Sequence, residues 1–273
     1  MNIVIPLIIL ILLLLFIHFN FAMRRVHSPH RSYDSIKEVI YIDYQDSKIY
    51  GELIKPEKDD CDTLIIGSHG FNGSYIYFRQ ALGYRLSEEG YALYCFDFIN
   101  GSKRSKSGGS IEYMSALDEV EQLKTVYSFF KDRYKNIILA GESQGGLIST
   151  LASKDLTDIK SLILYYPAYC AVDDAKKRWN NNNTNELFKI KFKSDYTKEL
   201  TTIDLADYIK NINVPTILIH GDKDRTVDVK YAYWAKQLNP EIELHIIKDN
   251  DHGFNQAGRV EASNYVSYFL SKL

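Results

Sequence analysis

The chain has 273 residues, of which 45% are hydrophobic and 25% are charged, and its formal net charge is -2. These values are ordinary for a globular protein, and the nearly balanced charge gives no indication of a nucleic-acid partner. The three cysteines, Cys61, Cys95 and Cys170, have neither CxxC nor zinc-type spacing, which argues against a disulfide framework or a zinc site.

The N-terminal 24 residues differ from the rest of the chain. An apolar run over 3–23 is interrupted at only three positions, and about 20 residues of helix, rising about 1.5 Å each, are enough to cross a bilayer core. No basic residue precedes the run and no small-residue cleavage site follows it. We therefore predict an uncleaved transmembrane anchor over 1–24 and a linker over 25–35.

The residues after the apolar run indicate an orientation in the membrane. Arg24, Arg25 and Arg31 follow the run, and basic residues beside a span favour the cytoplasmic side. We therefore predict that the C-terminal domain is cytoplasmic and that the membrane is a partner of this chain. A domain outside the cell on a signal anchor is the alternative.

Predicted strands and helices alternate over 36–273. The first two strands, 36–44 and 48–56, are expected to form an edge hairpin. Further strands are predicted at 63–70, 91–98, 136–141, 161–168, 214–221 and 242–249, and helices at 77–90, 112–134, 144–153, 229–238 and 257–273. This alternation predicts an α/β domain with a mostly parallel eight-stranded sheet that helices cover on both faces.

Three segments need separate comment. From about 169 to 205 no strand is predicted and an asparagine run interrupts any helix, so we expect a cap insertion at one end of the sheet. The loop over 100–110 is basic, and both contact with an anionic headgroup and plain solvent exposure remain open. The helix over 112–134 has an apolar stripe made of Met114, Leu117, Val120, Leu123, Tyr127 and Phe130.

A serine lies between glycines where a buried strand becomes a helix. Residues 141–145 read Gly-Glu-Ser-Gln-Gly, which fits the pattern G-x-S-x-G. Such a turn is strained and closely packed, and it lifts the serine hydroxyl above the end of the strand. The pattern alone is weak evidence, because serine and glycine are common in turns. A catalytic serine also needs a base, and a carboxylate that orients the base.

Candidates for the carboxylate and the base follow the serine in that order. Asp222 and Asp224 come directly after the strand at 214–221, and His252 lies in the polar loop after the last strand. Ser143, Asp224 and His252 are then expected beyond the carboxyl ends of three strands. Ligands bind at this edge of an open α/β sheet.

Four sequence blocks resemble the signatures of the α/β-hydrolase superfamily: SHGFNGS, GESQGG, HGDKDRTV and DHGF. Their order and spacing span nearly all of 36–273, and the S-Q-G-G turn with an insertion after the sixth strand is similar to small bacterial cinnamoyl (feruloyl) esterases. The resemblance implies an α/β-hydrolase fold in which Ser143 is the nucleophile, His252 the general base and acid, and Asp224 the orienting carboxylate. Asp222 is the rival for the last role.

The resemblance also implies an oxyanion hole made by the backbone N–H groups of Phe71 and Gln144. Tyr169 follows the sixth strand and is a candidate to line the substrate pocket. No metal or cofactor is expected, because the chain contains no Walker A, G-x-G-x-x-G or H-E-x-x-H sequence. The expected reaction is cleavage of a carboxylic ester through an acyl-enzyme on Ser143.

Other functions remain open on the sequence alone. A lysophospholipase or monoacylglycerol lipase would use the same three residues, and the predicted anchor favours a lipid substrate. A serine aminopeptidase of the same fold would need an acidic group to hold the amine of its substrate. A scaffold protein on an inactive hydrolase fold is the alternative of a different class. One fold supports many reactions, so the pattern does not identify the substrate.

Overall fold

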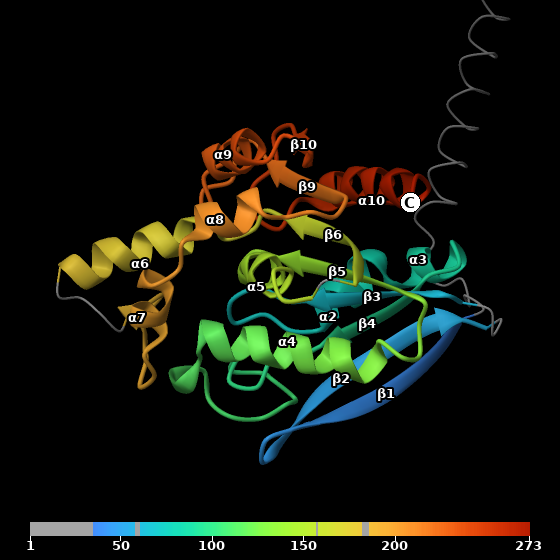
Figure 1. The fold of residues 1–273 in the computed structure, drawn as a ribbon, viewed down its shortest axis with the longest axis horizontal. Coiled ribbons are helices and arrows are strands. Elements are labelled where there is room, and N and C mark those ends of the chain that lie inside the picture. The colour runs from blue at the N-terminus through green and yellow to red at the C-terminus, as the bar shows by residue number, and fades with distance from the viewer. Residues whose placement is uncertain (1–34, 58–60, 157, 182–185) are drawn as a thin grey trace, which may run out of the picture. The chain divides into compact units, whose positions relative to one another are not determined.

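A computed structural model describes residues 35–57, 61–156, 158–181 and 186–273 (Figure 1). Its centre is an eight-stranded sheet with the order β1-β2-β4-β3-β5-β6-β9-β10. Strand β2 is antiparallel to both of its neighbours, and the other paired strands are parallel. The prediction of a mostly parallel sheet of eight strands is confirmed.

Each sheet strand overlaps a predicted range. Strand β3 is buried along nearly its whole length, as expected for a parallel strand that is covered on both faces. The strands are β1 (Ser35–Tyr44), β2 (Ser47–Pro56), β3 (Thr63–Ser68), β4 (Ala92–Phe96), β5 (Asn136–Glu142), β6 (Ile159–Tyr165), β9 (Thr216–Gly221) and β10 (Glu243–Ile247).

Helices cover the two faces of the sheet. Leu64 and Ile66 of β3 belong to an apolar cluster with α4 and α5, whereas Ile65 belongs to a second cluster with α3 and α10. Successive side chains of a strand point to opposite faces, so one strand supplies both clusters. The helices are α2 (Ile76–Phe78), α3 (Tyr84–Glu88), α4 (Ala116–Phe130), α5 (Gln144–Ala152), α6 (Cys170–Asn180), α7 (Tyr196–Thr201), α8 (Leu205–Lys210), α9 (Lys230–Leu238) and α10 (Gln256–Leu270).

Two predicted helices differ in detail from the structure. The helix expected at 77–90 consists of α2, a π-helical turn over Arg79–Gly83, and α3. The helix expected at 112–134 is preceded by a 3-10 turn and begins at Ala116, where the hydroxyl of Ser115 caps it. The prediction that Leu117 lies on the apolar stripe is wrong, because this side chain is 44% exposed. Val120, Leu123, Tyr127 and Phe130 are buried as predicted, and Ala116 takes the place of Leu117 on the buried face.

The cap, residues 169–205, contains a short hairpin as well as helices α6 and α7. The hairpin pairs β7 (Glu186–Leu187) with β8 (Ile190–Lys191), so the expectation that this segment has no strand is wrong. Strands of two residues are too short to show an alternating pattern. Figure 1 shows α6 and α7 at one end of the sheet. Buried cap residues such as Tyr196 and Leu200 join the apolar cluster that contains α4 and α5.

Residues Ser35–Leu273 pack as one compact unit. The predicted anchor over 1–24 lies outside the described residues, as does the predicted linker over 25–35 except for Ser35, where β1 begins. A search of the described ranges found no helix with the length and apolar character that a membrane span requires.

Candidate active site

The turn between β5 and α5 holds Ser143 at φ 50° and ψ -118°, a strained backbone conformation. Close packing explains the glycines around it. A Cβ on Gly141 would lie 2.2 Å from the carbonyl oxygen of Gly145, and a Cβ on Gly145 would lie 2.2 Å from the carbonyl oxygen of Ser68 in β3. The glycines therefore let α5 approach the sheet and leave the serine at the carboxyl end of β5.

A chain of hydrogen bonds joins Ser143, His252 and Asp224. The imidazole Nε2 of His252 lies 3.0 Å from Ser143 Oγ, and its Nδ1 lies 2.7 Å from Asp224 Oδ2. A proton on Nδ1, donated to the carboxylate, leaves Nε2 able to accept the proton of the serine. The structure thus brings together three predicted residues from turns that follow β5, β9 and β10.

Asp224 is buried and surrounded by hydrogen-bond donors. Its Oδ1 accepts the N–H groups of Thr226 and Val227, both at 2.8 Å. Its Oδ2 contacts His252 and lies 3.3 Å from Nε2 of His220. Burial raises the pKa of the Asp224 carboxyl, but the hydrogen bonds from His220, His252 and Val227 outweigh burial and lower that pKa below its usual range. The group therefore stays ionised opposite the imidazole.

The neighbouring carboxylates, Asp222 and Asp251, do not contact the imidazole of His252. Oδ1 of Asp222 is buried and has no hydrogen-bond partner among the described residues. Asp251 accepts the backbone N–H groups of Arg225 and His252 at 3.0 and 2.8 Å, and it also accepts the Arg225 guanidinium. Asp251 thus connects the loops after β9 and β10, and Asp224 is the carboxylate that contacts the imidazole.

Phe71 and Gln144 border the space beside Ser143. The loop of Phe71 lies against the serine, because a Cβ on Gly70 would be 3.0 Å from Ser143 Cβ. No acceptor within the described ranges takes the Phe71 N–H. Gln144 is the first residue of α5, and the first N–H groups of a helix lack intrahelical partners. Both groups can therefore donate to a bound oxygen atom.

The side chain of Gln144 links helix α4 to the cap, a role that the sequence did not predict. Its Nε2 donates to Glu119 at 2.6 Å, and the Tyr196 hydroxyl donates to its Oε1 at 2.6 Å. Burial raises the pKa of Glu119 to about 8. The available signal was helical spacing, because Glu119 lies three residues after Ala116 and four before Leu123, on the buried face.

Glu142, directly before Ser143, holds the loop that follows β3. Its Oε1 accepts the Gly70 N–H at 3.2 Å, and its Oε2 accepts the Tyr166 hydroxyl at 3.0 Å. Burial raises the pKa of Glu142 to about 7. The Tyr166 ring packs on His252 with centroids 4.5 Å apart. The G-x-S-x-G pattern leaves this position open, so the sequence carried no signal for it.

A cavity of about 80 Å³ lies between Ser143 and the cap. Tyr169 does not line it, contrary to the prediction, because this side chain is buried in the core with its hydroxyl 2.8 Å from Thr150 Oγ1. Most of the lining is apolar. The lining residues are Phe71, Ser143, Gln144, Ala168, Cys170, Ala171, Asp174, Arg178, Leu187, Phe188, Tyr196, Thr226 and Val227.

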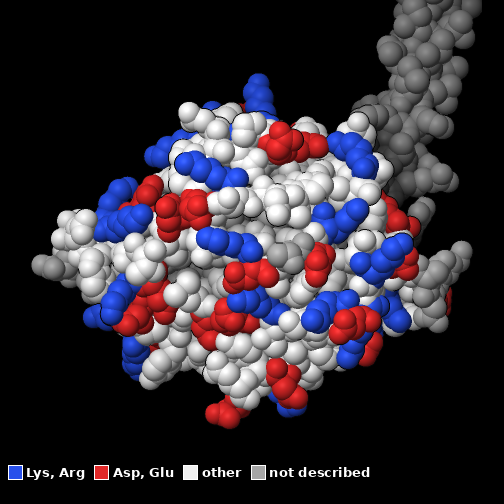
Figure 2. All heavy atoms as spheres, in the orientation of Figure 1, with Lys and Arg blue, Asp and Glu red and all other residues white. Residues whose placement is uncertain are grey.

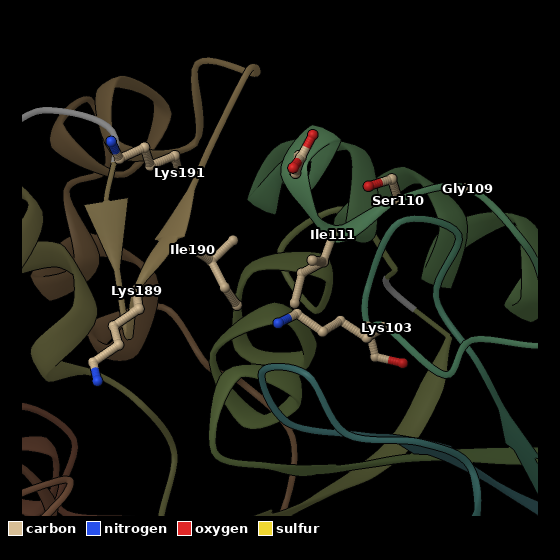
Figure 3. Close-up of a pocket in the computed structure, with 9 residues that line it drawn as sticks. Lys103, Gly109, Ser110, Ile111, Lys189, Ile190 and Lys191 are labelled. Atoms are coloured by element: carbon tan, nitrogen blue, oxygen red, sulfur yellow. The ribbon is translucent and has the colours of Figure 1, made fainter.

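The β7–β8 hairpin also borders a wider, open groove of about 490 Å³. Figure 3 shows Lys189 and Lys191 of the hairpin on one side and Lys103 and Ser110 on the other. Glu112 also lines this groove, and it forms an ion pair with Lys193 of the cap, which does not line the groove. The basic loop over 100–110 therefore faces the cap. On the face seen in Figure 2, acidic and basic side chains are interspersed.

Comparisons with known proteins identify similar folds and a matching family model. The esterase Est1E of Butyrivibrio proteoclasticus, solved with ferulic acid, is 22% identical, covers 85% of this chain and 99% of its own, and has a TM-score of 0.73. A family model described as serine aminopeptidase, S33, matches residues 59–194, which include Ser143 and end before Asp224. The chain has the α/β-hydrolase fold. The predicted resemblance and fold are confirmed.

Two other solved structures resemble this chain in fold. The Pyrococcus furiosus esterase Pf2001 is 23% identical over 90% of this chain and 95% of its own, with a TM-score of 0.68. The esterase EaEST of Exiguobacterium antarcticum is 19% identical over 85% and 99%, with a TM-score of 0.65. No match was found among curated proteins. In the described part of the chain, no three His, Cys, Asp or Glu side chains form a cluster suited to a metal.

Proposed function

We propose that this α/β-hydrolase cleaves carboxylic esters through an acyl-enzyme on Ser143. The observation that carries the proposal is the pair of contacts made by His252, 3.0 Å to Ser143 and 2.7 Å to Asp224. Serine becomes a competent nucleophile when a base receives its proton and a carboxylate stabilises the imidazolium that forms. The similar solved structures are described as esterases.

The proposed reaction has two halves. Ser143 Oγ attacks the ester carbonyl carbon while His252 Nε2 takes the hydroxyl proton, and the N–H groups of Phe71 and Gln144 stabilise the oxyanion. The carbon–oxygen bond to the alcohol then breaks, and the alcohol leaves with the proton from His252. In the second half, water gives a proton to His252 and attacks the acyl carbon. The acid is released and Ser143 regains its proton.

The size of the cavity bears on the acyl group. Pockets that enclose drug-sized ligands measure about 300–1,000 Å³, whereas the cavity beside Ser143 measures about 80 Å³. This favours short acyl groups over the long chains that a lysophospholipase or monoacylglycerol lipase would accept.

A serine aminopeptidase is the second candidate, because Asp174 lies in the cavity wall and is an acidic group of the kind that holds a substrate amine. The description of the matching family favours it as well. Arg178 lies in the same wall, one helical turn from Asp174, and would repel a cationic amine. We therefore place the ester reaction first.

A fluorophosphonate probe and a substrate panel test the proposal. The panel contains short acyl esters, monoacylglycerols, lysophospholipids and aminoacyl amides. We expect the probe to label the full chain at Ser143 and the short esters to be cleaved fastest, and Ser143→Ala should abolish both labelling and turnover. A chain that neither labels nor cleaves any member would favour the scaffold alternative. Faster cleavage of aminoacyl amides would favour the aminopeptidase.

We also propose, from the sequence, that residues 1–24 anchor the chain in a membrane with the domain on the cytoplasmic side. The support is the apolar run over 3–23 and the arginines that follow it. Alkaline extraction should leave the full chain with the membrane fraction, and a protease added outside intact cells should not cut the domain. Cutting would instead place the domain outside.

A further inference from the structure

Arg178 is a charged residue in the wall of the cavity beside Ser143. It lies in the last turn of α6 and is half-buried. Its Nε and Nη2 atoms are inaccessible to solvent and have no hydrogen-bond partner among the described residues. Buried polar atoms are nearly always hydrogen-bonded, and a buried charge without a partner is costly. The cap thus holds a guanidinium of which two nitrogen atoms, Nε and Nη2, are not used by the described protein groups.

Neighbouring polar groups in the cavity wall have other partners. The Tyr196 hydroxyl donates to Gln144. Asp174, one turn before Arg178, lies 3.5 Å from Lys177 Nζ, and its side chain is 46% exposed. The Asp174 carboxylate is therefore paired with Lys177 on the solvent-exposed side of the helix. Among the described residues it forms no ion pair with Arg178. Because Arg178 lines the cavity, a rotation of its side chain would bring the two unpaired nitrogen atoms to a molecule bound there.

We propose that Arg178 binds a carboxylate of the substrate, so that the natural ester carries an anionic group besides the bond that is cleaved. This inference rests on the proposed function and adds the substrate class to it. A planar guanidinium matches a carboxylate with two parallel hydrogen bonds. The apolar walls of the cavity, which include Leu187 and Val227, exclude water and strengthen that contact.

The lysines near the cavity act in the same direction. Lys189 and Lys191 lie in the hairpin that contributes to the cavity wall, and Lys103 faces them across the neighbouring groove. Positive charge near a site raises the local concentration of anions. The lysines would therefore attract an anionic ester, and Arg178 would fix its position.

Two pairs of matched substrates test the inference. The first pair carries the charge on the leaving alcohol: 4-acetoxybenzoate and its neutral analogue 4-acetoxybenzamide. The second pair carries it on the acyl group: the mono-4-nitrophenyl ester of adipic acid and its neutral carboxamide analogue. The ratio of kcat/KM within a pair isolates the contribution of the anion from that of the reacting bond. Arg178→Gln removes the guanidinium, and Lys176→Gln removes one positive charge from an exposed position of the same helix as a control.

In at least one pair, the unmodified protein should prefer the anion by about tenfold or more, the effect expected of hydrogen bonds to a charged group. Arg178→Gln should abolish this preference, and the ratio within each pair corrects for any change in turnover of the neutral ester. Arg178→Lys should retain part of the preference, and Lys176→Gln should retain nearly all of it.

Two results would overturn the inference: no preference for either anion in the unmodified protein, or the same preference in Arg178→Gln. Either result leaves the proposed function intact if the neutral esters are cleaved in a manner that depends on Ser143. If no ester is cleaved and the fluorophosphonate does not label Ser143, the proposed function itself fails, and this inference fails with it.

Discussion

At the scale of single residues, the site depends on how many donors surround one carboxylate. Asp224 accepts two backbone N–H groups and contacts His220 and His252. The two backbone contacts fix the orientation of Oδ1, which directs Oδ2 toward the imidazole. Asp222, only two residues earlier, has no comparable contacts among the described residues.

Replacing Asp224 with Asn should therefore remove activity without removing the fold. We expect kcat to fall by about 10³-fold to 10⁴-fold, the effect of the matching change in a serine protease, because an amide favours the wrong imidazole tautomer. Asp222→Asn is the matched control and should keep kcat within about threefold. Steady-state kinetics on a short ester decide the matter, and equal losses in the two variants would contradict the assignment of Asp224.

At the scale of secondary-structure elements, the turn after β5 depends on close packing against β3 as well as on backbone strain. Gly145 lies where the backbone of β3 leaves no room for a side chain. Ser143 keeps a positive φ only because helix α5 and strand β5 are both packed against their neighbours.

Gly145→Ala should therefore destabilise the protein by more than about 2 kcal/mol, because a Cβ at 2.2 Å from the Ser68 carbonyl oxygen forces α5 away from the sheet. Gly90→Ala is the control: its φ of 93° is strained for alanine, but the new methyl group would meet no atom within 4 Å. We expect a loss of about 1–2 kcal/mol there. Urea unfolding of both variants measures the difference, and similar losses would show that the close contact is relieved easily.

The side chain of Gln144 forms a polar contact between the cap and the core. Tyr196 of α7 donates to Gln144 Oε1, and Glu119 of α4 receives the Gln144 amide. All three side chains are buried, so a lost partner is not readily replaced by solvent.

Tyr196→Phe should cost about 1–3 kcal/mol of stability, because it leaves the Gln144 oxygen buried without its donor. It should also lower kcat, since the backbone of Gln144 borders the reacting oxygen. Tyr268→Phe, which changes a 63% exposed tyrosine of α10, serves as the control. Unchanged stability and kcat in Tyr196→Phe would show that the bond does not hold the cap.

At the scale of the whole molecule, two buried carboxyls link stability to pH. Burial raises the pKa of Glu119 to about 8 and that of Glu142 to about 7. In the unfolded chain a glutamate titrates near pH 4.3. Between these values the folded state holds a proton that the unfolded state has released, so stability falls as pH rises through this range.

Glu119→Gln should remove part of that dependence, since glutamine has a similar shape and never ionises. Relative to the unmodified protein, this variant should gain more than about 1 kcal/mol of stability between about pH 5 and pH 9, given about 1.4 kcal/mol per pKa unit. Urea unfolding at the two pH values measures the change. Parallel curves for the two proteins would mean that Glu119 is ionised throughout.

Much of the fold was predictable because its signals are local. Strand β5 contains an apolar run that ends at Gly141, and the blocks around Ser143, Asp224 and His252 occur in a recognisable order. The hairpin of the cap was missed because β7 and β8 have two residues each. Glu119 was missed because a buried carboxyl is recognised only from its partners, and these come from α5 and, through Gln144, from α7. Tyr169 was misplaced because the strand pattern does not show which side of the chain faces the cavity.

Gln144 contacts the cap through its side chain and borders the cavity beside Ser143. Its amide oxygen is held by Tyr196 of the cap, and its peptide nitrogen borders the space where the reacting oxygen would sit. On the proposed mechanism, admission of a bulky substrate by lifting α7 would therefore also loosen the group that stabilises negative charge. Such an enzyme would discriminate by turnover number as much as by affinity, with oversized esters bound but converted slowly.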